Sequence, residues 1–310
     1  MSKGSLFWAN ASGKLGEVVQ YRAGGEQRAR AYVRKIKNPK TLAQAQNRLS
    51  MLNLATAFKM MSEFIRVSFV NRPTNQSGFN AFVKANKNPS SPVISKNEAQ
   101  QGLFVPTNMV VSDGGIILPF EIKVMSPSDL NATCIGHIFG LGESEEMLTT
   151  DAFKAIVGSE FNPDDEEGTK VILDTKEKIS AALTLLGLPQ DAVITLLRCE
   201  YMDEGWNVRR VKKSINDVAE DELCPFFLYY NRISGTFIGF ESGYDALTDD
   251  SIYLAMPISY NVNGKRDITR SSFIPSNSSI SLAEDWMPGG FVYDQIMQSY
   301  VQTEASAIEV

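Results

Sequence analysis

Apolar residues between positions 45 and 65 recur every three or four residues, and this spacing constrains the fold more than any other feature of the sequence. The recurring positions are Ala45, Leu49, Leu52, Ala55, Phe58, Met61 and Ile65. Side chains at this spacing share one face of an α-helix, so the pattern predicts a helix from about Leu42 to Ser68 that packs into a core. Thr41 followed three residues later by Gln44 is a capping-box pair, which predicts the helix start.

Two strand-like segments precede this helix and predict a β-hairpin. Residues 17–22 and 29–36 alternate as strands do, and Ala23-Gly24-Gly25-Glu26 between them tolerates the positive φ angles of a tight turn. Because successive side chains of a strand point to opposite faces, we expect Arg28, Arg30 and Arg34 to share one exposed face. A second, shorter helix is predicted over residues 77–85.

The sequence predicts an α+β fold in four parts. A basic hairpin–helix domain covers residues 1–88, a Pro/Ser-rich linker covers 89–105, and a β-rich domain with two helices, at 149–157 and 177–186, covers 106–275. A two-residue turn signal predicts a hairpin at Asn263-Gly264, and the segment Ser112-Asp113-Gly114-Gly115 predicts another. Residues 276–310 are predicted to form an extended C-terminal arm.

The predicted arm carries aromatic side chains in polar surroundings: Trp286, Phe291, Tyr293 and Tyr300. Aromatic residues on a loosely structured tail are common at interfaces with partners. The same residues also fit an arm folded back on its own domain, and the sequence leaves the two interpretations open.

Charge is distributed unevenly along the chain. Residues 1–72 hold thirteen Lys or Arg against three Glu, a net charge of +10, whereas the whole chain is −6 and residues 73–310 are therefore −16. A basic head on an acidic body favours contact with a polyanion or head-to-body assembly. The candidate interaction residues are the cations of the hairpin and its exit: Arg22, Arg28, Arg30, Arg34, Lys35, Lys37 and Lys40.

Nucleotide-binding and hydrolase motifs are absent from the sequence, which contains no Walker loop, no Gly-x-Gly-x-x-Gly fingerprint and no Gly-x-Ser-x-Gly elbow. The single histidine, His137, lies in an apolar run, and the acidic segment 164–167 lacks the alternating order of a calcium loop. Cys134, Cys199 and Cys224 are widely spaced, which favours buried thiols over a disulfide framework or a zinc site. We therefore expect no enzyme activity, catalytic residue, metal, cofactor or small-molecule substrate.

The basic head has two interpretations. It could contact nucleic acid without sequence specificity, because no helix-turn-helix, zinc finger or RNP-like motif accompanies the cations. It could instead dock on an acidic protein surface, including that of a second copy, and a head-to-tail contact of this kind closes into a ring if its rotation permits. No apolar run is long enough to span a membrane and no signal-like segment opens the sequence, so we expect assembly in a cytoplasm.

The N-terminal residues resemble a known signature. The string Gly13-Lys14-Leu15-Gly16, an Arg-bearing strand and then Asn38-Pro39-Lys40-Thr41-x-x-Gln44 are similar to the start of a domain-of-unknown-function family encoded by Bacteroidota and by their phages, crAss-like phages among them. Asn80-Ala81 is similar to the second helix of that family. The resemblance covers about the first ninety residues.

The resemblance implies a structural protein of a phage virion, such as a subunit of a head–tail connector or tail ring, assembled in the host cytoplasm. Its partners would be further copies of the chain and other virion proteins, with possible non-specific contact to packaged DNA. The alternative is a non-specific nucleic-acid-binding or packaged accessory protein that uses the same basic segment. The family supplies no catalytic residues.

Overall fold

The computed structural model describes residues 13–23, 26–32, 41–123, 134–141, 145–158, 168–202, 205–209, 226–231, 235–241, 252–275 and 279–306. The fold is α+β, as the sequence predicts, with an N-terminal hairpin and a β-rich body. The chain divides into two compact units, Met1–Thr41 and Leu42–Val310.

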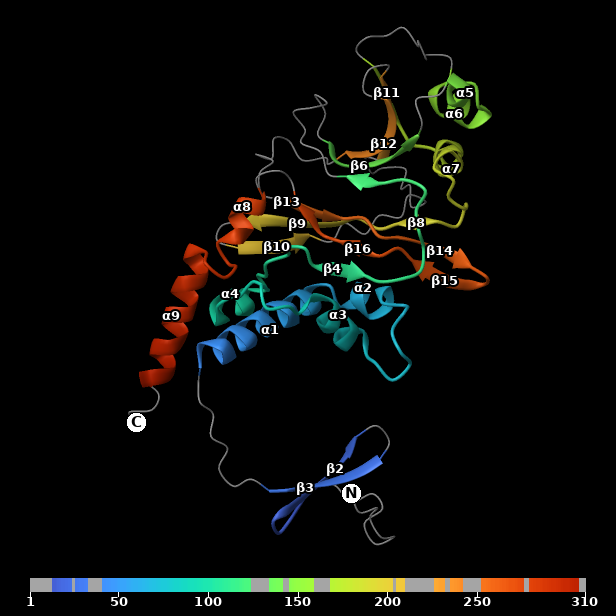
Figure 1. Cartoon of the computed structure of the whole chain (residues 1–310). Coiled ribbons are helices and arrows are strands. Elements are labelled where there is room, and N and C mark those ends of the chain that lie inside the picture. The colour runs from blue at the N-terminus through green and yellow to red at the C-terminus, as the bar shows by residue number, and fades with distance from the viewer. Residues whose placement is uncertain are drawn as a thin grey trace. The chain divides into compact units, whose positions relative to one another are not determined.

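The helices and strands follow one another along the chain as Figure 1 shows. The helices are α1 (Leu42–Met60), α2 (Ser62–Ser68), α3 (Gly78–Asn86), α4 (Lys96–Gln101), α5 (Glu145–Leu148), α6 (Asp151–Val157), α7 (Lys176–Leu185), α8 (Ser279–Glu284) and α9 (Phe291–Ser306). The strands are β1 (Gly13–Leu15), β2 (Val18–Ala23), β3 (Glu26–Ala31), β4 (Val110–Ser112), β5 (Ile122–Lys123), β6 (Cys134–Leu141), β7 (Thr169–Ile172), β8 (Val193–Ile194), β9 (Leu197–Met202), β10 (Gly205–Arg209), β11 (Phe226–Asn231), β12 (Gly235–Glu241), β13 (Ile252–Ala255), β14 (Ile258–Val262), β15 (Lys265–Ile268), β16 (Ser271–Ser272) and β17 (Ile274–Pro275).

The first unit contains one sheet, in the order β1-β2-β3, and the second unit contains the others. A five-stranded sheet has the order β5-β6-β12-β11-β7, and a four-stranded sheet has the order β10-β9-β13-β17. Shorter sheets, β15-β14-β8 and β16-β4, complete the described strands. In Figure 1 helices α1, α2 and α3 form a layer beside β4, and α6 and α7 lie beside the five-stranded sheet, against one face of it.

The predicted helix over residues 42–68 is present, but it is interrupted. Met61 separates α1 from α2 with φ −112° and ψ 20°, outside the helical region. The Met61 side chain is buried in the core. The apolar spacing continues through the break, which is why the sequence predicts one helix where the structure has two.

The buried face of α1 also differs from the predicted apolar stripe. Ser50, Asn53 and Thr56 are buried there, whereas Ala55 and Phe58 are only partly buried. Asn53 Nδ2 donates to the carbonyl oxygen of Val105 at 3.1 Å, and its Oδ1 accepts from the Val105 N–H at 2.8 Å. A buried amide that satisfies both groups of another segment's backbone replaces the pairing of a neighbouring strand.

Helix α3 holds a backbone segment through an asparagine in the same way. Asn86 Nδ2 donates to the Val110 carbonyl at 2.8 Å, and its Oδ1 accepts from the Val110 N–H at 2.6 Å. Ser77 caps the helix by accepting from the N–H of Asn80, so the second predicted helix is confirmed. Two asparagines thus fix the segment 105–110 to the helical layer.

The predicted linker 89–105 does not separate two domains. Val93, Ile94, Phe104 and Val105 are almost fully buried. One core cluster joins side chains of α1–α3 to side chains of β4, β9 and β13. The observed division between compact units instead follows Thr41, because the helices predicted to belong with the basic hairpin bury their apolar faces against strands from the rest of the chain.

A second core cluster lies where α6 and α7 meet β11, β12 and β14. The two predicted helices of the β-rich domain are both present, and each begins at a threonine cap: Thr150 accepts from the N–H of Phe153, and Thr175 from that of Lys178. Gly187 follows α7 with φ +67°, the left-handed conformation that ends many helices.

The hairpin predicted at Asn263-Gly264 is confirmed, and the one predicted around residues 112–115 is wrong. Asn263 and Gly264 both have positive φ, +52° and +77°, and join β14 to β15 in a two-residue turn. Residues 112–115, by contrast, do not close a hairpin, because β4 pairs with β16. Ile116 forms a bridge with Thr269. The partners of this turn-like sequence therefore lie about 150 residues further along the chain.

Candidate interaction surface

The first unit contains three short antiparallel strands in its described residues. The pairing of β2 with β3 gives the sheet two faces, as the predicted hairpin does. Leu15 pairs with Val18 around Gly16 and Glu17, and Gly16 has the φ of +58° that such a turn needs. On the other side of β2, Val19 pairs with Arg30 and Tyr21 pairs with Arg28. Cross-strand partners share a face, so the register assigns each described side chain to one side of the sheet.

One side, named here the tyrosine face, consists of Lys14, Val19, Tyr21, Glu26, Arg28, Arg30 and Tyr32. The Lys14 Nζ atom lies 3.7 Å from the centroid of the Tyr32 ring. The Arg30 guanidinium carbon lies 5.8 Å from the centroid of the Tyr21 ring. Both distances are within the range of cation–π attraction, so the rings hold two cations against this face.

The other side, named here the alanine face, consists of Val18, Gln20, Arg22, Gln27, Ala29 and Ala31. Val18 pairs with Ala31, Gln20 with Ala29, and Arg22 with Gln27. Small and apolar side chains therefore gather at one end of this face, and its single cation, Arg22, lies at the other end.

Among the described residues of the first unit, no side chain of this sheet is buried under a covering layer. Of the side chains described between residues 13 and 32, none is buried, and every residue of β3 is exposed. Val18, Tyr21 and Tyr32 are each about 40% exposed. A three-stranded sheet usually needs one hydrophobic face packed against something to be stable. Within the described residues, neither face of this sheet provides a buried core.

The predicted interaction residues fall into three groups. Arg28 and Arg30 share the tyrosine face, as predicted from strand alternation. Arg22 lies on the opposite face. Arg34, Lys35, Lys37 and Lys40 lie outside the described residues. The sequence missed Lys14 and Tyr32 as a pair, because their contact depends on β1, a strand that the hairpin prediction did not include.

The C-terminal segment is not an extended arm over the described residues 279–306. It forms α8 and α9, and Trp286 between them is only 6% exposed. The indole Nε1–H of Trp286 donates to Glu98 Oε1 at 2.8 Å, and its ring meets Tyr201 edge-on. The structure therefore favours the segment folded back on its own unit, because its aromatic residues find apolar and hydrogen-bonding partners there.

Helix α9 contacts α1 through two of the predicted aromatic residues, Tyr293 and Tyr300. Tyr293 and Tyr300 are partly buried beside Leu49 and Met297. The Tyr300 hydroxyl accepts from Arg48 Nη1 at 3.2 Å. Only Phe291, 70% exposed, keeps the exposure expected of an interface residue. A groove of about 440 Å³, with Leu49 and Ile296 among its lining residues, runs between α1, α4 and α9.

We expect the substitution Trp286→Phe to lower the free energy of unfolding by about 1–3 kcal/mol, the usual cost of losing a hydrogen bond to a charged group. Phenylalanine keeps an aromatic ring beside Tyr201 but cannot donate to Glu98. Chemical denaturation of the full chain measures the change. Phe291→Leu, at an exposed position of the same segment, is the control and should leave stability nearly unchanged.

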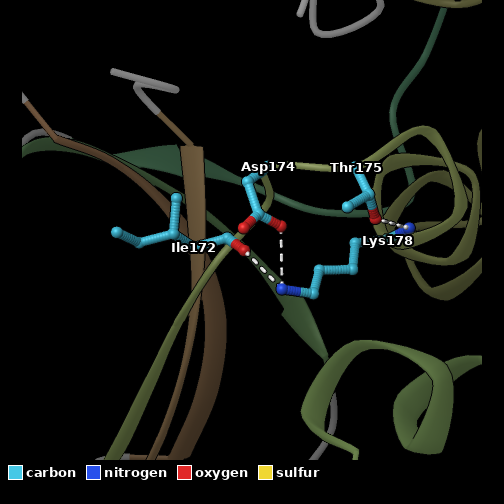
Figure 2. Close-up of polar contacts among 4 residues, drawn as sticks. All are labelled: Ile172, Asp174, Thr175 and Lys178. Carbon is cyan, nitrogen blue, oxygen red and sulfur yellow. Dashed lines mark hydrogen bonds and ion pairs between the residues drawn. The ribbon is translucent and has the colours of Figure 1, made fainter. Parts of the chain in front are cut away.

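A polar cluster closes the start of α7, and Figure 2 shows its contacts. Lys178 Nζ donates to Asp174 Oδ1 at 2.8 Å and to the Ile172 carbonyl at 3.4 Å. The hydrogen bond from Lys178 lowers the pKa of the Asp174 carboxyl below its usual value. Both side chains are partly or largely exposed, so the pair contributes only a little to stability and offers no enclosed site.

The pH dependence of this pair follows from the direction of the shift. A carboxyl whose folded pKa is depressed stabilises the fold above its unfolded pKa, and the contribution is lost as pH falls through the folded pKa. We expect Lys178→Gln to cost less than about 1 kcal/mol near neutral pH. The difference from the wild type should shrink as pH falls below the ordinary carboxyl pKa of 3.8, and it should vanish once the pH is below the lowered pKa of Asp174. Denaturation across pH measures it, and Lys176→Gln, an exposed lysine in the same turn, is the control.

The remaining residues that the sequence singled out for possible chemistry lie partly within and partly outside the described residues. No group of three metal-ligating side chains occurs within the described ranges. No helix among the residues placed by the structure is long and apolar enough to cross a membrane. Cys199 is fully buried. The acidic segment 164–167 and Cys224 lie outside the described residues, as do the side chains of His137 and Cys134.

In comparisons with known proteins, no family model matches the chain, and no curated protein or solved structure does so either.

Proposed function

We propose that the chain is a structural subunit of a phage virion, in a head–tail connector or a tail ring, whose N-terminal sheet docks on a neighbouring copy. The observation that carries this proposal is the sheet itself: it is a separate unit, and none of its described side chains is buried. Such a sheet gains stability when its apolar face is covered. The docking side is the alanine face, because Val18, Ala29 and Ala31 give it small and apolar side chains that can pack against a protein surface.

Charge supports a second copy as the neighbour. Residues 1–41 contain nine Lys or Arg and two Glu, a net charge of +7, which leaves −13 for residues 42–310 of a chain at −6. The first compact unit is therefore positive, and the second unit is negative in total. Opposite charges on unlike surfaces attract the head of one copy to the body of the next. Repeated contacts of this heterologous kind close into rings or extend as filaments.

The assignment to a virion rests on the N-terminal resemblance to proteins of Bacteroidota and their phages. Assembly would take place in the host cytoplasm, and the finished particle would contain the protein together with other virion proteins. Helix α9 leaves Phe291 exposed as a further point of contact.

Mass photometry of the purified full chain at low and high salt tests the proposal. We expect discrete oligomers without nucleic acid, and we expect high salt to weaken them because ions screen exposed charges. A chain that stays monomeric at every salt concentration, and that joins no assembly of virion proteins, would contradict the proposal.

A second candidate function is a non-specific nucleic-acid-binding or packaged accessory protein. The cations and rings gathered on the tyrosine face favour it. Its distinguishing result is a monomer that binds DNA with an affinity that falls steeply as salt rises.

A further inference from the structure

The tyrosine face combines three cations and two rings on one side of a small sheet. Arg28 and Arg30 are two residues apart on β3, so their Cα atoms are about 7 Å apart along the strand. Lys14 lies on the same face, because it pairs with Val19, the partner of Arg30. The cations therefore lie on the two outer strands, β1 and β3, with Val19 and Tyr21 of β2 between them.

Few acidic groups oppose these cations. The described sheet contains two carboxylates: Glu17, whose backbone carbonyl accepts from the N–H of Tyr32, and Glu26, which the register places on the tyrosine face at the start of β3. Glu26 lies 3.6 Å from Arg28, and both side chains are more than half exposed. An exposed ion pair of this kind is weak, so Arg28 can exchange Glu26 for a stronger anion at small cost.

We propose that the tyrosine face binds the sugar–phosphate backbone of nucleic acid, with Lys14, Arg28 and Arg30 on the phosphates. The inference rests on the proposed function, in which the alanine face meets the neighbouring copy and leaves the tyrosine face exposed. The sheet then joins the protein assembly on one side and the nucleic acid on the other.

The rings favour nucleic acid over an acidic peptide. Contacts with Tyr32 and Tyr21 hold Lys14 and Arg30 near the sheet, which lowers the side-chain entropy lost when these cations bind a phosphate. Aromatic side chains beside cations also provide surfaces on which bases of a single strand stack. A carboxylate peptide has no group that uses such surfaces, and it would be bound through charge alone.

Fluorescence anisotropy of the full chain with labelled oligothymidine, and with a labelled duplex of the same length, tests the inference. We expect binding at low salt that Arg28→Gln with Arg30→Gln weakens at least tenfold. Losing two phosphate contacts should also flatten the slope of log K against log salt by about 1.8 on duplex and about 1.4 on single strand. The control, Arg66→Gln with Lys84→Gln, removes the same charge from exposed positions on α2 and α3 and should change little.

A second variant separates the two forms of nucleic acid. Tyr21→Leu with Tyr32→Leu keeps every charge but removes the rings. We expect it to weaken single-strand binding at least tenfold, because base stacking on an aromatic ring contributes about 1–3 kcal/mol per base. Duplex binding should change less, since paired bases already stack on one another.

Two results would overturn the inference. One is no binding of either DNA at low salt. The other is displacement of DNA by polyglutamate as readily as by unlabelled DNA of equal charge, which would identify an acidic protein surface as the ligand. Oligomers that form without DNA and fail to bind it would overturn only this inference. Monomers that bind DNA would support it and contradict the proposed assembly.

Discussion

The substitution Asn53→Leu should lower the free energy of unfolding by about 2–5 kcal/mol, because it leaves a buried N–H and a buried carbonyl without their partner. Asn53 is 1% exposed, and both hydrogen bonds of its amide go to the backbone of Val105. Leucine has a similar length, so it excludes the water that could otherwise replace the amide. We expect the same effect for Asn86→Leu, since Asn86 holds Val110 in the same way.

Chemical denaturation of the full chain, followed by far-ultraviolet circular dichroism, measures these changes. Asn47→Leu is the matched control, because Asn47 lies on the same helix but is exposed and bonds only within α1. Its effect should stay within about 0.5 kcal/mol. A stability of Asn53→Leu equal to that of this control would show that the amide does not hold the segment 105–110.

The second large effect concerns assembly. We expect Ala29→Glu with Ala31→Glu to raise the protein concentration needed for oligomers at least about a hundredfold, since each buried unpaired charge costs several kcal/mol and each 1.4 kcal/mol is a factor of ten. Both alanines lie on the alanine face, so the glutamates would meet the neighbouring copy directly.

The control for this variant makes the same alanine-to-glutamate change elsewhere. Ala85→Glu with Ala155→Glu adds the same two charges at exposed positions of α3 and α6, in the second unit. Mass photometry over a range of concentrations compares the two variants with the wild type. Equal assembly of the two variants would contradict docking through the alanine face.

The sequence predicts the local elements of this fold well. The caps at Thr150, Thr175 and Ser77 begin helices where the sequence places them or within two residues. Asn263-Gly264 forms the two-residue turn that it predicts. In each case the information lies in a few neighbouring residues, and local hydrogen bonds or backbone angles are sufficient to determine the structure.

Long-range packing accounts for the errors. Asn53 and Asn86 look like surface residues of their helices, and only the backbone groups that they meet far along the chain explain their burial. Residues 89–105 look like a linker because they are rich in Pro and Ser, yet Val93 and Phe104 reach the core. Trp286 likewise needs Glu98, 188 residues away, before its place can be understood.

The candidate surface was predicted in part. Strand alternation places Arg28 and Arg30 together, and the register agrees. Alternation alone did not place Arg22, because the face of a residue on β2 depends on how that strand pairs with β3. The contact between Lys14 and Tyr32 depends on β1, which has only three residues and a glycine turn.

Cross-linking of an isotopically mixed sample tests the central claim most directly, that the basic head of one copy meets the acidic body of another. Light and heavy chains would be mixed, assembled and treated with a carbodiimide, which joins lysine to carboxylate without a spacer. We predict mixed light–heavy links between lysines of residues 1–41 and carboxylates of residues 42–310, lost in high salt. Links confined to chains of one isotope would contradict the account.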